Sequence, residues 1–223
     1  MDKTILIAGS SGLVGSEILR NLERSNNKLV LLSRKEIANK KNINQIIINF
    51  DDINSLDTSI ILDEVYIAIG QKLSLFELIY VKKNKRKDLI KVDYEYIKSI
   101  AMFAQKCGAK SISLISAIGA DQNSLNTYLN VKGKIEKEIL SLGFLKVIIA
   151  QPSHLLGDRP NEKISLSIKI FETITNFTGH FLFGPLIKYR NISSKSLAKA
   201  IISKTENSEN GVHYINYNYF KKY

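Results

Sequence analysis

The sequence predicts an α/β protein with a doubly wound parallel sheet and a small substrate-side lid in its C-terminal part. Short runs rich in Ile, Val and Leu alternate along the chain with amphipathic stretches, and few of these runs alternate with polar residues. Strands that are buried on both faces have this composition, which is typical of a parallel sheet covered by helices. In addition, a glycine-rich turn directly follows the first apolar run.

The order of the elements supports this fold class. Apolar runs predict strands at 4–8, 28–32, 45–50, 64–69, 111–115 and 146–150. Amphipathic patterns between them predict helices at 13–22, 90–104 and 131–142, which gives repeated βαβ units. The connection 33–44 is too short for a full helix. The remainder is less regular, with helices expected near 165–177 and 194–203, a loop at 179–184 and a last apolar alternation at 212–217.

Composition excludes several classes of protein. The chain has 223 residues, 44% of them hydrophobic and 24% charged, which suits a globular domain with a real core. Cys107 is the only cysteine, so we expect a reducing compartment, no internal disulfide and no metal site. No apolar run reaches the ~20 residues of a membrane helix. We find no targeting segment at the start and therefore expect a cytoplasmic protein without membrane contact.

The net charge of +11 raises the question of a nucleic-acid partner. We disfavour such a partner because only 6 of the 32 cations are Arg, the residue that contacts bases and phosphates bidentately. Apart from a cluster at 82–87, the Lys residues are scattered. A solvated basic surface is the preferred interpretation.

The glycine turn predicts a dinucleotide site of the Rossmann type. The first glycine permits a tight turn, the second lets the backbone approach a pyrophosphate, and the third lets the helix pack close to the strand. Backbone N–H groups at the helix start would then hold the phosphates. The sequence of the turn is Gly9-Ser10-Ser11-Gly12-Leu13-Val14-Gly15. Its G-x-x-G-x-x-G spacing resembles the extended and atypical branches of the short-chain dehydrogenase/reductase superfamily.

The end of the second strand indicates which dinucleotide is bound. An NAD site usually has a carboxylate here for the ribose 2′-hydroxyl, whereas this chain has Arg34 and Lys35. A guanidinium suits a 2′-phosphate, so NADP(H) is favoured and NAD(H) stays possible. The alternative is that Arg34 stacks on the adenine of either cofactor.

In this superfamily, a Tyr and a Lys four residues later share a helix face with a Ser nearby. The Tyr exchanges a proton with the substrate oxygen, the Lys favours the tyrosinate and holds the ribose, and the Ser orients the oxygen, so we expect a lowered Tyr pKa. Three pairs have this spacing, and only one follows a strand that ends in a serine. The three pairs are Tyr94/Lys98, Tyr128/Lys132 and Tyr217/Lys221. We therefore select Tyr128 and Lys132 with Ser116; an exposed helix pair is the alternative.

Local sequence sharpens the resemblance. Residues 114–121 (LISAIGAD) and 128–136 (YLNVKGKIE) are similar to the HTATIP2 (TIP30/CC3) family of atypical short-chain reductases, and so are 92–96 and 150–159. The resemblance implies Ser116, Tyr128 and Lys132 as the catalytic set and Lys132 as a cofactor ligand. The other cofactor contacts that we assign are Gly9, Ser10, Ser11, Gly12, Leu13, Val14, Arg34, Asn49, Phe50, Ala68, Ile69, Gly70 and Pro152. Family members commonly have Ser where Ala117 stands and often Arg where Gln151 stands.

These observations predict one NAD(P)-binding domain over 1–223, with 153–190 forming a small substrate-side subregion. The predicted function is NADP(H)-dependent hydride transfer to or from a small carbonyl or alcohol compound. The alternative is an NADP(H)-binding regulatory protein with little turnover. His154 could line the pocket or pack in a loop, and Arg159 could meet an anionic substrate or belong to a turn. The sequence does not determine the oligomeric state.

Overall fold

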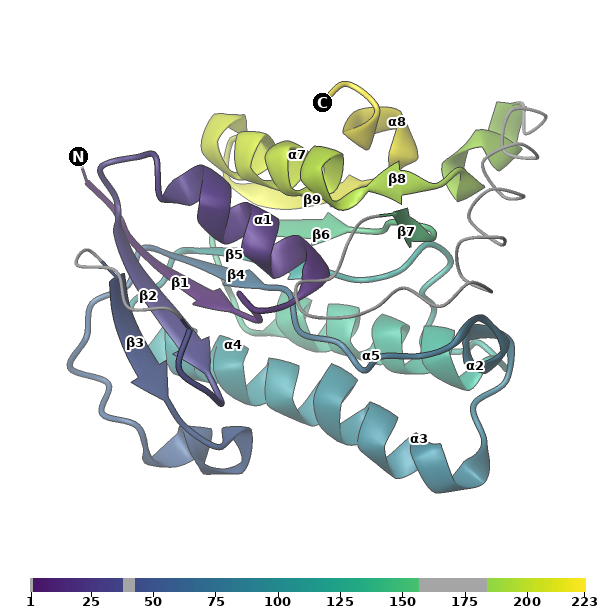
Figure 1. Cartoon of the computed structure of the whole chain (residues 1–223), viewed down its shortest axis with the longest axis horizontal. Helices are drawn as coiled ribbons and strands as arrows, with labels where there is room; N and C mark the ends of the chain where they lie inside the picture. Colours follow the sequence, from purple (N-terminus) through teal and green to yellow (C-terminus); the bar gives the residue numbers. More distant parts are fainter. Residues whose placement is uncertain (1, 38–42, 157–183) are drawn as a thin grey trace.

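The computed structural model describes residues 2–37, 43–156 and 184–223. Seven parallel strands form one sheet in the order β3-β2-β1-β4-β5-β6-β9. Helices cover both faces, with α1 and α7 on one and α4 and α5 on the other (Figure 1). The predicted doubly wound parallel sheet is therefore confirmed. The strands are β1 (Thr4–Ala8), β2 (Lys28–Ser33), β3 (Ile43–Ile47), β4 (Glu64–Ile67), β5 (Ser111–Ile115), β6 (Lys146–Ala150) and β9 (Gly211–Ile215).

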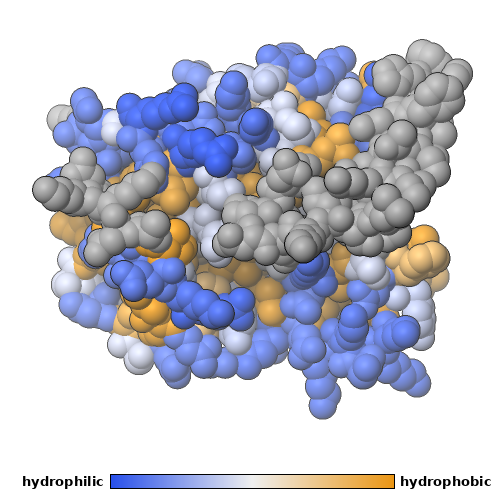
Figure 2. All heavy atoms as spheres, viewed as in Figure 1, coloured by the Kyte–Doolittle hydropathy of each residue, from blue (hydrophilic) through white to orange (hydrophobic). Residues whose placement is uncertain are grey.

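Alternate side chains of the central strands enter two separate cores. In β1, Leu6 and Ala8 face α4 (Ile97–Lys106) and α5 (Thr127–Ser141), while Ile5 and Ile7 face the other helical layer. That layer consists mainly of α1 (Leu13–Leu22) and α7 (Ser194–Asn207). Because both faces of the strand are buried, its sequence is continuously apolar. Figure 2 shows hydrophilic residues over much of the two helical layers and hydrophobic residues mostly between them.

The helix before β5 is longer than its apolar pattern predicted. It runs through α3 (Lys83–Ile90), a π-helical turn η2 (Lys91–Tyr96) and α4. The basic start of α3 has no apolar stripe, so periodicity missed it. The π-helical turn also shifts the phase of the helix, so that Leu89 is buried while Ile90, which the pattern placed on the apolar face, is 39% exposed.

Two predicted strands differ at their ends. The third strand runs from Ile43 to Ile47. It ends there because the chain turns into the 3₁₀ helix η1 (Phe50–Ser55). Asn49 caps this helix by accepting a hydrogen bond from the backbone N–H of Asp51. The fourth ends at Ile67, and 68–70 continue as a loop at the carboxyl edge of the sheet. Both departures place predicted cofactor contacts in loops at that edge.

The C-terminal part completes the sheet. The predicted helix at 194–203 is α7, and the apolar alternation near 212–217 forms β9, which pairs in parallel with β6. Shorter elements are α2 (Leu75–Ile79), β7 (Leu155–Leu156), η3 (Gly184–Tyr189), β8 (Ile192–Ser193) and α8 (Tyr217–Phe220). The helix expected near 165–177 and nearly all of the 179–184 loop lie outside the described residues. Within the described ranges, no helix is both long and apolar enough to cross a membrane.

Candidate functional site

The glycine turn joins β1 to α1, and two of its glycines are required by close packing. Gly9 has φ +90°, and a Cβ on it would lie 2.6 Å from the carbonyl oxygen of Ala68. A Cβ on Gly15 would lie 2.1 Å from the carbonyl oxygen of Gly9. A Cβ on Gly12 would meet only looser neighbours, Gly9 O at 3.2 Å and Ala68 O at 3.8 Å. The backbone at Gly12 therefore remains open to a bound group.

Two further features of this turn fit a phosphate. Gly12 is the N-cap of α1, no side chain caps the helix, and its first turn contains no acidic residue. The hydroxyl of Ser10 is buried and has no hydrogen-bond partner among the described residues. An uncapped helix start and an orphaned buried donor are the groups that an anionic pyrophosphate would satisfy.

The end of β2 places an exposed cation beside the loop after β3. The guanidinium carbon of Arg34 lies 5.7 Å from the centre of the Phe50 ring, and this ring also packs edge-to-face on Tyr96 at 5.5 Å. Phe50 is buried, whereas Arg34 and Asn49 are exposed. Arg34 and Asn49 thus present the accessible polar groups of this predicted adenosine-side set.

The segment after β4 links the turn to the sequence-predicted catalytic residues. The backbone N–H of Ala68 donates to the carbonyl of Ala8 (2.8 Å). A Cβ on Gly70 would lie 3.4 Å from Asp93 Oδ1 and 4.0 Å from Lys132 Nζ. The predicted cofactor-lining segment 68–70 therefore lies between the glycine turn and Lys132.

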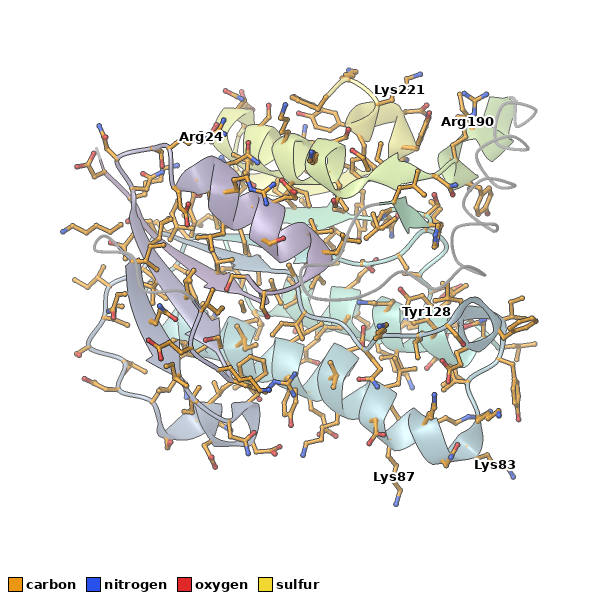
Figure 3. All side chains as sticks on the ribbon, viewed as in Figure 1. Arg24, Lys83, Lys87, Tyr128, Arg190 and Lys221 are labelled. Carbon is orange, nitrogen blue, oxygen red and sulfur yellow. The ribbon has the colours of Figure 1, made fainter. Side chains whose placement is uncertain are left out.

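Tyr128, labelled in Figure 3, lies in the first turn of α5, and Lys132 follows four residues later on the same helix face. Asn126 fixes that start, because its Oδ1 accepts from the backbone N–H of Leu129 (3.1 Å). Its Nδ2 donates to the carbonyl of Leu78 in α2 (2.8 Å). The Lys132 ammonium lies 6.0 Å from the centre of the Tyr128 ring. Tyr128 is half-buried, whereas Lys132 is buried.

A buried carboxylate that sequence reasoning did not assign holds Lys132. Lys132 Nζ lies 2.8 Å from Asp93 Oδ1 and donates to the carbonyl of Ile115 (3.4 Å). Asp93 lies in the π-helical turn η2, and its Oδ2 accepts from the backbone N–H of Gln71 (2.6 Å). The sequence feature that could have indicated this contact is an acidic residue, Asp93, within an otherwise apolar face of the predicted helix.

Ser116 is held by a second unassigned carboxylate. Its backbone N–H donates to the carbonyl of Ala150 (2.8 Å), and its hydroxyl donates to Glu136 Oε1. Glu136 also accepts from Gln151 Nε2, at 3.0 Å to Oε1 and 3.2 Å to Oε2. Ser116 and Glu136 are both buried. Glu136 follows Lys132 by one helical turn, so the available signal was the spacing Tyr-x-x-x-Lys-x-x-x-Glu.

Burial and neighbouring charges shift the pKa values of Tyr128, Lys132 and Glu136. Burial raises the pKa of Tyr128, the charge of Lys132 lowers it, and the charge of Asp93 raises it, with a net rise. The expected lowering of the Tyr128 pKa is therefore wrong for this arrangement, because burial, assisted by the charge of Asp93, outweighs the effect of Lys132. Burial disfavours the charged form of Lys132, but the attraction of Asp93 leaves its pKa raised. Burial also raises the pKa of Glu136.

The two other Tyr/Lys pairs lie elsewhere. Tyr94 Oη and Lys98 Nζ both bind Glu138, at 3.1 Å and 2.8 Å. Tyr217 begins the short helix α8, on the α7 side of the sheet and away from α5 (Figures 1 and 3). The polar groups of the first pair are thus engaged with Glu138, and the second pair lies on the opposite face of the sheet from α5.

The remaining candidates follow β6. Pro152 is buried, and its carbonyl accepts from the backbone N–H of Ile118 (2.9 Å), which joins the β6 and β5 loops. His154 is half-buried, and its carbonyl accepts from the backbone N–H of Ile192 (3.2 Å). Arg159 lies outside the described residues.

Comparison with known proteins identifies relatives along almost the whole chain. Residues 5–218 match the model of the NAD dependent epimerase/dehydratase family. Protein FMP52, mitochondrial, of Candida albicans is 30% identical over 207 residues, covering 92% of this chain and 89% of that protein. Protein HTATIP2 of Rattus norvegicus is 28% identical over 170 residues, covering 73% of this chain and 66% of that protein. The resemblance to the HTATIP2 family is thus confirmed.

Solved structures share the fold. The Bordetella bronchiseptica enzyme WbmH in complex with NAD+ has a TM-score of 0.70 at 14% identity, covering 97% of this chain and 76% of that chain. A short chain dehydrogenase family protein from Francisella tularensis has a TM-score of 0.69 at 18% identity, covering 99% and 100%.

One prediction from the sequence is contradicted by these comparisons. The relatives from Candida albicans, Candida glabrata and Scheffersomyces stipitis are named as mitochondrial proteins. The expected cytoplasmic location, which depended on finding no targeting segment at the start of the chain, is therefore wrong.

Proposed function

The chain belongs to the NAD dependent epimerase/dehydratase family, and from this membership and the geometry of the site we propose that it is an NADP(H)-dependent oxidoreductase. Its substrate is a small carbonyl or alcohol compound. One observation carries the proposal: Ser116, Tyr128 and Lys132 lie at the edge of the sheet that holds the glycine turn. Lys132 lies beside Tyr128 and binds the carbonyl of Ile115, the residue before Ser116. The 68–70 segment connects Lys132 with the glycine turn.

The chain provides a place for each part of the cofactor. The open backbone at Gly12, the start of α1 and the Ser10 hydroxyl suit the pyrophosphate. Arg34 suits a 2′-phosphate, which favours NADP(H) over NAD(H). The third donor of the Lys132 ammonium, beyond those directed at Asp93 and Ile115, suits the ribose hydroxyls. The remaining proposed contacts are Ser11, Leu13, Val14, Asn49, Phe50, Ala68, Ile69, Gly70 and Pro152.

Tyr128 carries the proton in this proposal. When bound, the nicotinamide supplies or accepts a hydride. The raised pKa of Tyr128 keeps its hydroxyl protonated near neutral pH, which suits proton donation to a carbonyl oxygen. Lys132 stays charged beside it, and the hydroxyl of Ser116 orients the substrate oxygen. We further propose that 153–190 form a small substrate-side part of a single domain.

A regulatory role is a second candidate, favoured by one observation. The hydroxyl of Ser116 is directed to Glu136 and the charge of Lys132 is compensated by Asp93, so two of the three catalytic groups already have partners. An NADP(H)-binding protein with little turnover would show this pattern.

Steady-state NADPH oxidation with phenanthrenequinone and a panel of aldehydes and ketones separates the two candidates. We expect turnover that Tyr128→Phe removes while NADPH binding persists. NADPH binding without oxidation of any substrate would instead support the regulatory role, and absence of dinucleotide binding would contradict both.

A further inference from the structure

We propose that Glu136 is a positioning residue that sets the direction in which the Ser116 hydroxyl donates its hydrogen bond, and so controls whether Ser116 can orient a substrate oxygen. This inference rests on the proposed oxidoreductase function. It starts from the hydrogen-bonded group of buried Ser116, buried Glu136 and half-buried Gln151, which that function leaves partly unexplained.

The hydrogen bonds show why the direction matters. An ionised carboxylate can only accept, so Ser116 donates its single hydroxyl hydrogen to Glu136 Oε1. Gln151 Nε2 also donates to the carboxyl group of Glu136, at 3.0 Å to Oε1 and 3.2 Å to Oε2. In this state Ser116 has only acceptor capacity left and cannot donate to a substrate oxygen.

Protonation of Glu136 reverses the bond. The neutral carboxyl donates its O–H to Ser116 Oγ, and the hydrogen of Ser116 becomes available to a carbonyl oxygen beside Tyr128. The proton on Glu136 comes from solvent and is not consumed, so only hydrogen bonds are exchanged. The substrate oxygen then receives two donors, from Tyr128 and Ser116, in place of one.

The surroundings of Glu136 make this protonation accessible. Glu136 is only 6% exposed, and this burial is the main cause of its raised pKa, which the bonds from Gln151 and Ser116 and the charge of Lys132 partly oppose. Lys132, one turn earlier on α5, is itself compensated by Asp93. From β9, Tyr214 adds an ionisable group whose pKa is raised by burial and by the charge of Glu136.

The expected consequence is an additional pH dependence of carbonyl reduction. Reduction needs neutral Glu136, so its rate falls as the pH rises through the pKa of Glu136. Loss of one preorganised donor to a reacting oxygen lowers kcat by about 10²–10³-fold. A second fall, at higher pH, comes from ionisation of Tyr128.

Glu136→Gln is the decisive variant. Its amide N–H can donate to Ser116 while its carbonyl accepts from Gln151, as the neutral carboxyl would. With NADPH and phenanthrenequinone we expect the lower-pH fall to disappear and the Tyr128 fall to remain. Glu138→Gln is the matched control, because Glu138 lies on the same helix but binds Tyr94 and Lys98, and we expect it to keep both falls. A lower-pH fall that persists in Glu136→Gln, or activity as low as that of Ser116→Ala at every pH, would overturn the inference.

A direct titration tests the same coupling without a substrate. The carboxyl carbon of Glu136 is followed by NMR in protein labelled with ¹³C-glutamate. Because Ser116 and Gln151 each donate to the carboxylate, we expect Ser116→Ala and Gln151→Leu to raise the pKa of Glu136. A titration that neither variant moves would refute the inference, even if Glu136→Gln failed to fold. Failure of the proposed function has a different signature, namely no NADPH-dependent reduction or full activity in Tyr128→Phe.

Discussion

Lys132 Nζ lies 2.8 Å from Asp93 Oδ1, and the two side chains are only 5% and 1% exposed. The Asp93 carboxylate has two effects: it raises the pKa of the buried Lys132 ammonium, which keeps it charged, and it opposes the lowering of the Tyr128 pKa by that ammonium. The titration of the proposed acid therefore depends on a residue from a different helix, in the π-helical turn η2.

Asp93→Asn tests this relationship. While Lys132 stays protonated, removing the negative charge leaves its attraction for the Tyr128 phenolate unopposed, so we expect the pKa of Tyr128 to fall. Reduction requires protonated Tyr128 and is lost as the pH rises through this pKa, so the loss should occur at lower pH in the variant. Leaving Lys132 buried without its ion-pair partner should also cost about 3–5 kcal/mol of unfolding free energy. The measurements are the pH profile of reduction and denaturant unfolding; an unshifted profile would contradict the assignment.

Gly12→Val tests the dinucleotide site. A branched side chain would occupy the open backbone position where we place the pyrophosphate, so we expect NADPH binding to be abolished. The fold should survive, because the turn lies at the carboxyl edge of the sheet and the close contact of a Cβ with Gly9 O, 3.2 Å, is relieved by a small shift of the turn. Fluorescence titration with NADPH and thermal unfolding measure the two effects.

Gly15→Ala is the contrasting variant in the same turn. Its Cβ would lie 2.1 Å from the carbonyl oxygen of Gly9, so we expect a large loss of thermal stability. If the neighbouring variant Gly12→Val is folded and binds NADPH normally, the assignment of the dinucleotide site to this turn is wrong.

Arg34→Asp tests the preference for NADP(H). Loss of a charge-assisted hydrogen bond to the 2′-phosphate is worth about 1.5–3 kcal/mol, or roughly ten- to a hundredfold in NADPH affinity. NADH, which lacks that phosphate, should lose less. Arg24→Asp removes another exposed arginine, near the far end of α1, and should change neither affinity (Figure 3). Tighter binding of NADH than NADPH by the wild-type protein would refute the role of Arg34.

Tyr128→Phe tests proton transfer. The variant deletes one hydroxyl and keeps the ring, so stability and NADPH affinity should change little. Reduction should fall by about 10²–10⁴-fold, the usual contribution of a positioned acid. Tyr94→Phe and Tyr217→Phe should leave turnover intact, since the Tyr94 hydroxyl binds Glu138 and Tyr217 begins α8 on the α7 side of the sheet. Equal loss in all three variants would show that the Tyr128 hydroxyl has no special role.

Lys132→Met separates the two roles of the lysine. We expect weaker NADPH binding together with lower turnover, because the ammonium serves both the ribose and Tyr128. It also leaves Asp93 buried without a cation, so unfolding free energy should fall. Asp93→Asn combined with Lys132→Met should recover part of that stability, which unfolding of the double variant measures; no recovery would argue against a mutually stabilising pair.

The sequence by itself determined the features that depend on short stretches of chain. The apolar runs identified the strands because buried parallel strands need no polar side, and the spacing of Gly9, Gly12 and Gly15 identified the turn that joins the first of them to its helix. It also predicted Tyr128/Lys132 as the catalytic pair, rather than the other two Tyr/Lys pairs, from the order of the elements and the serine that ends the preceding strand.

Only the tertiary structure decided which charges meet. Asp93 and Lys132 lie on separate helices, and Glu136 reaches Ser116 from α5 across to the end of β5. Periodicity describes neighbours along one element, whereas these contacts depend on how helices pack on the sheet and on the π-helical turn that rotates Asp93 inward. Burial follows from the same packing, and so the direction of the Tyr128 pKa, which the sequence predicted incorrectly, could be determined only from the folded chain.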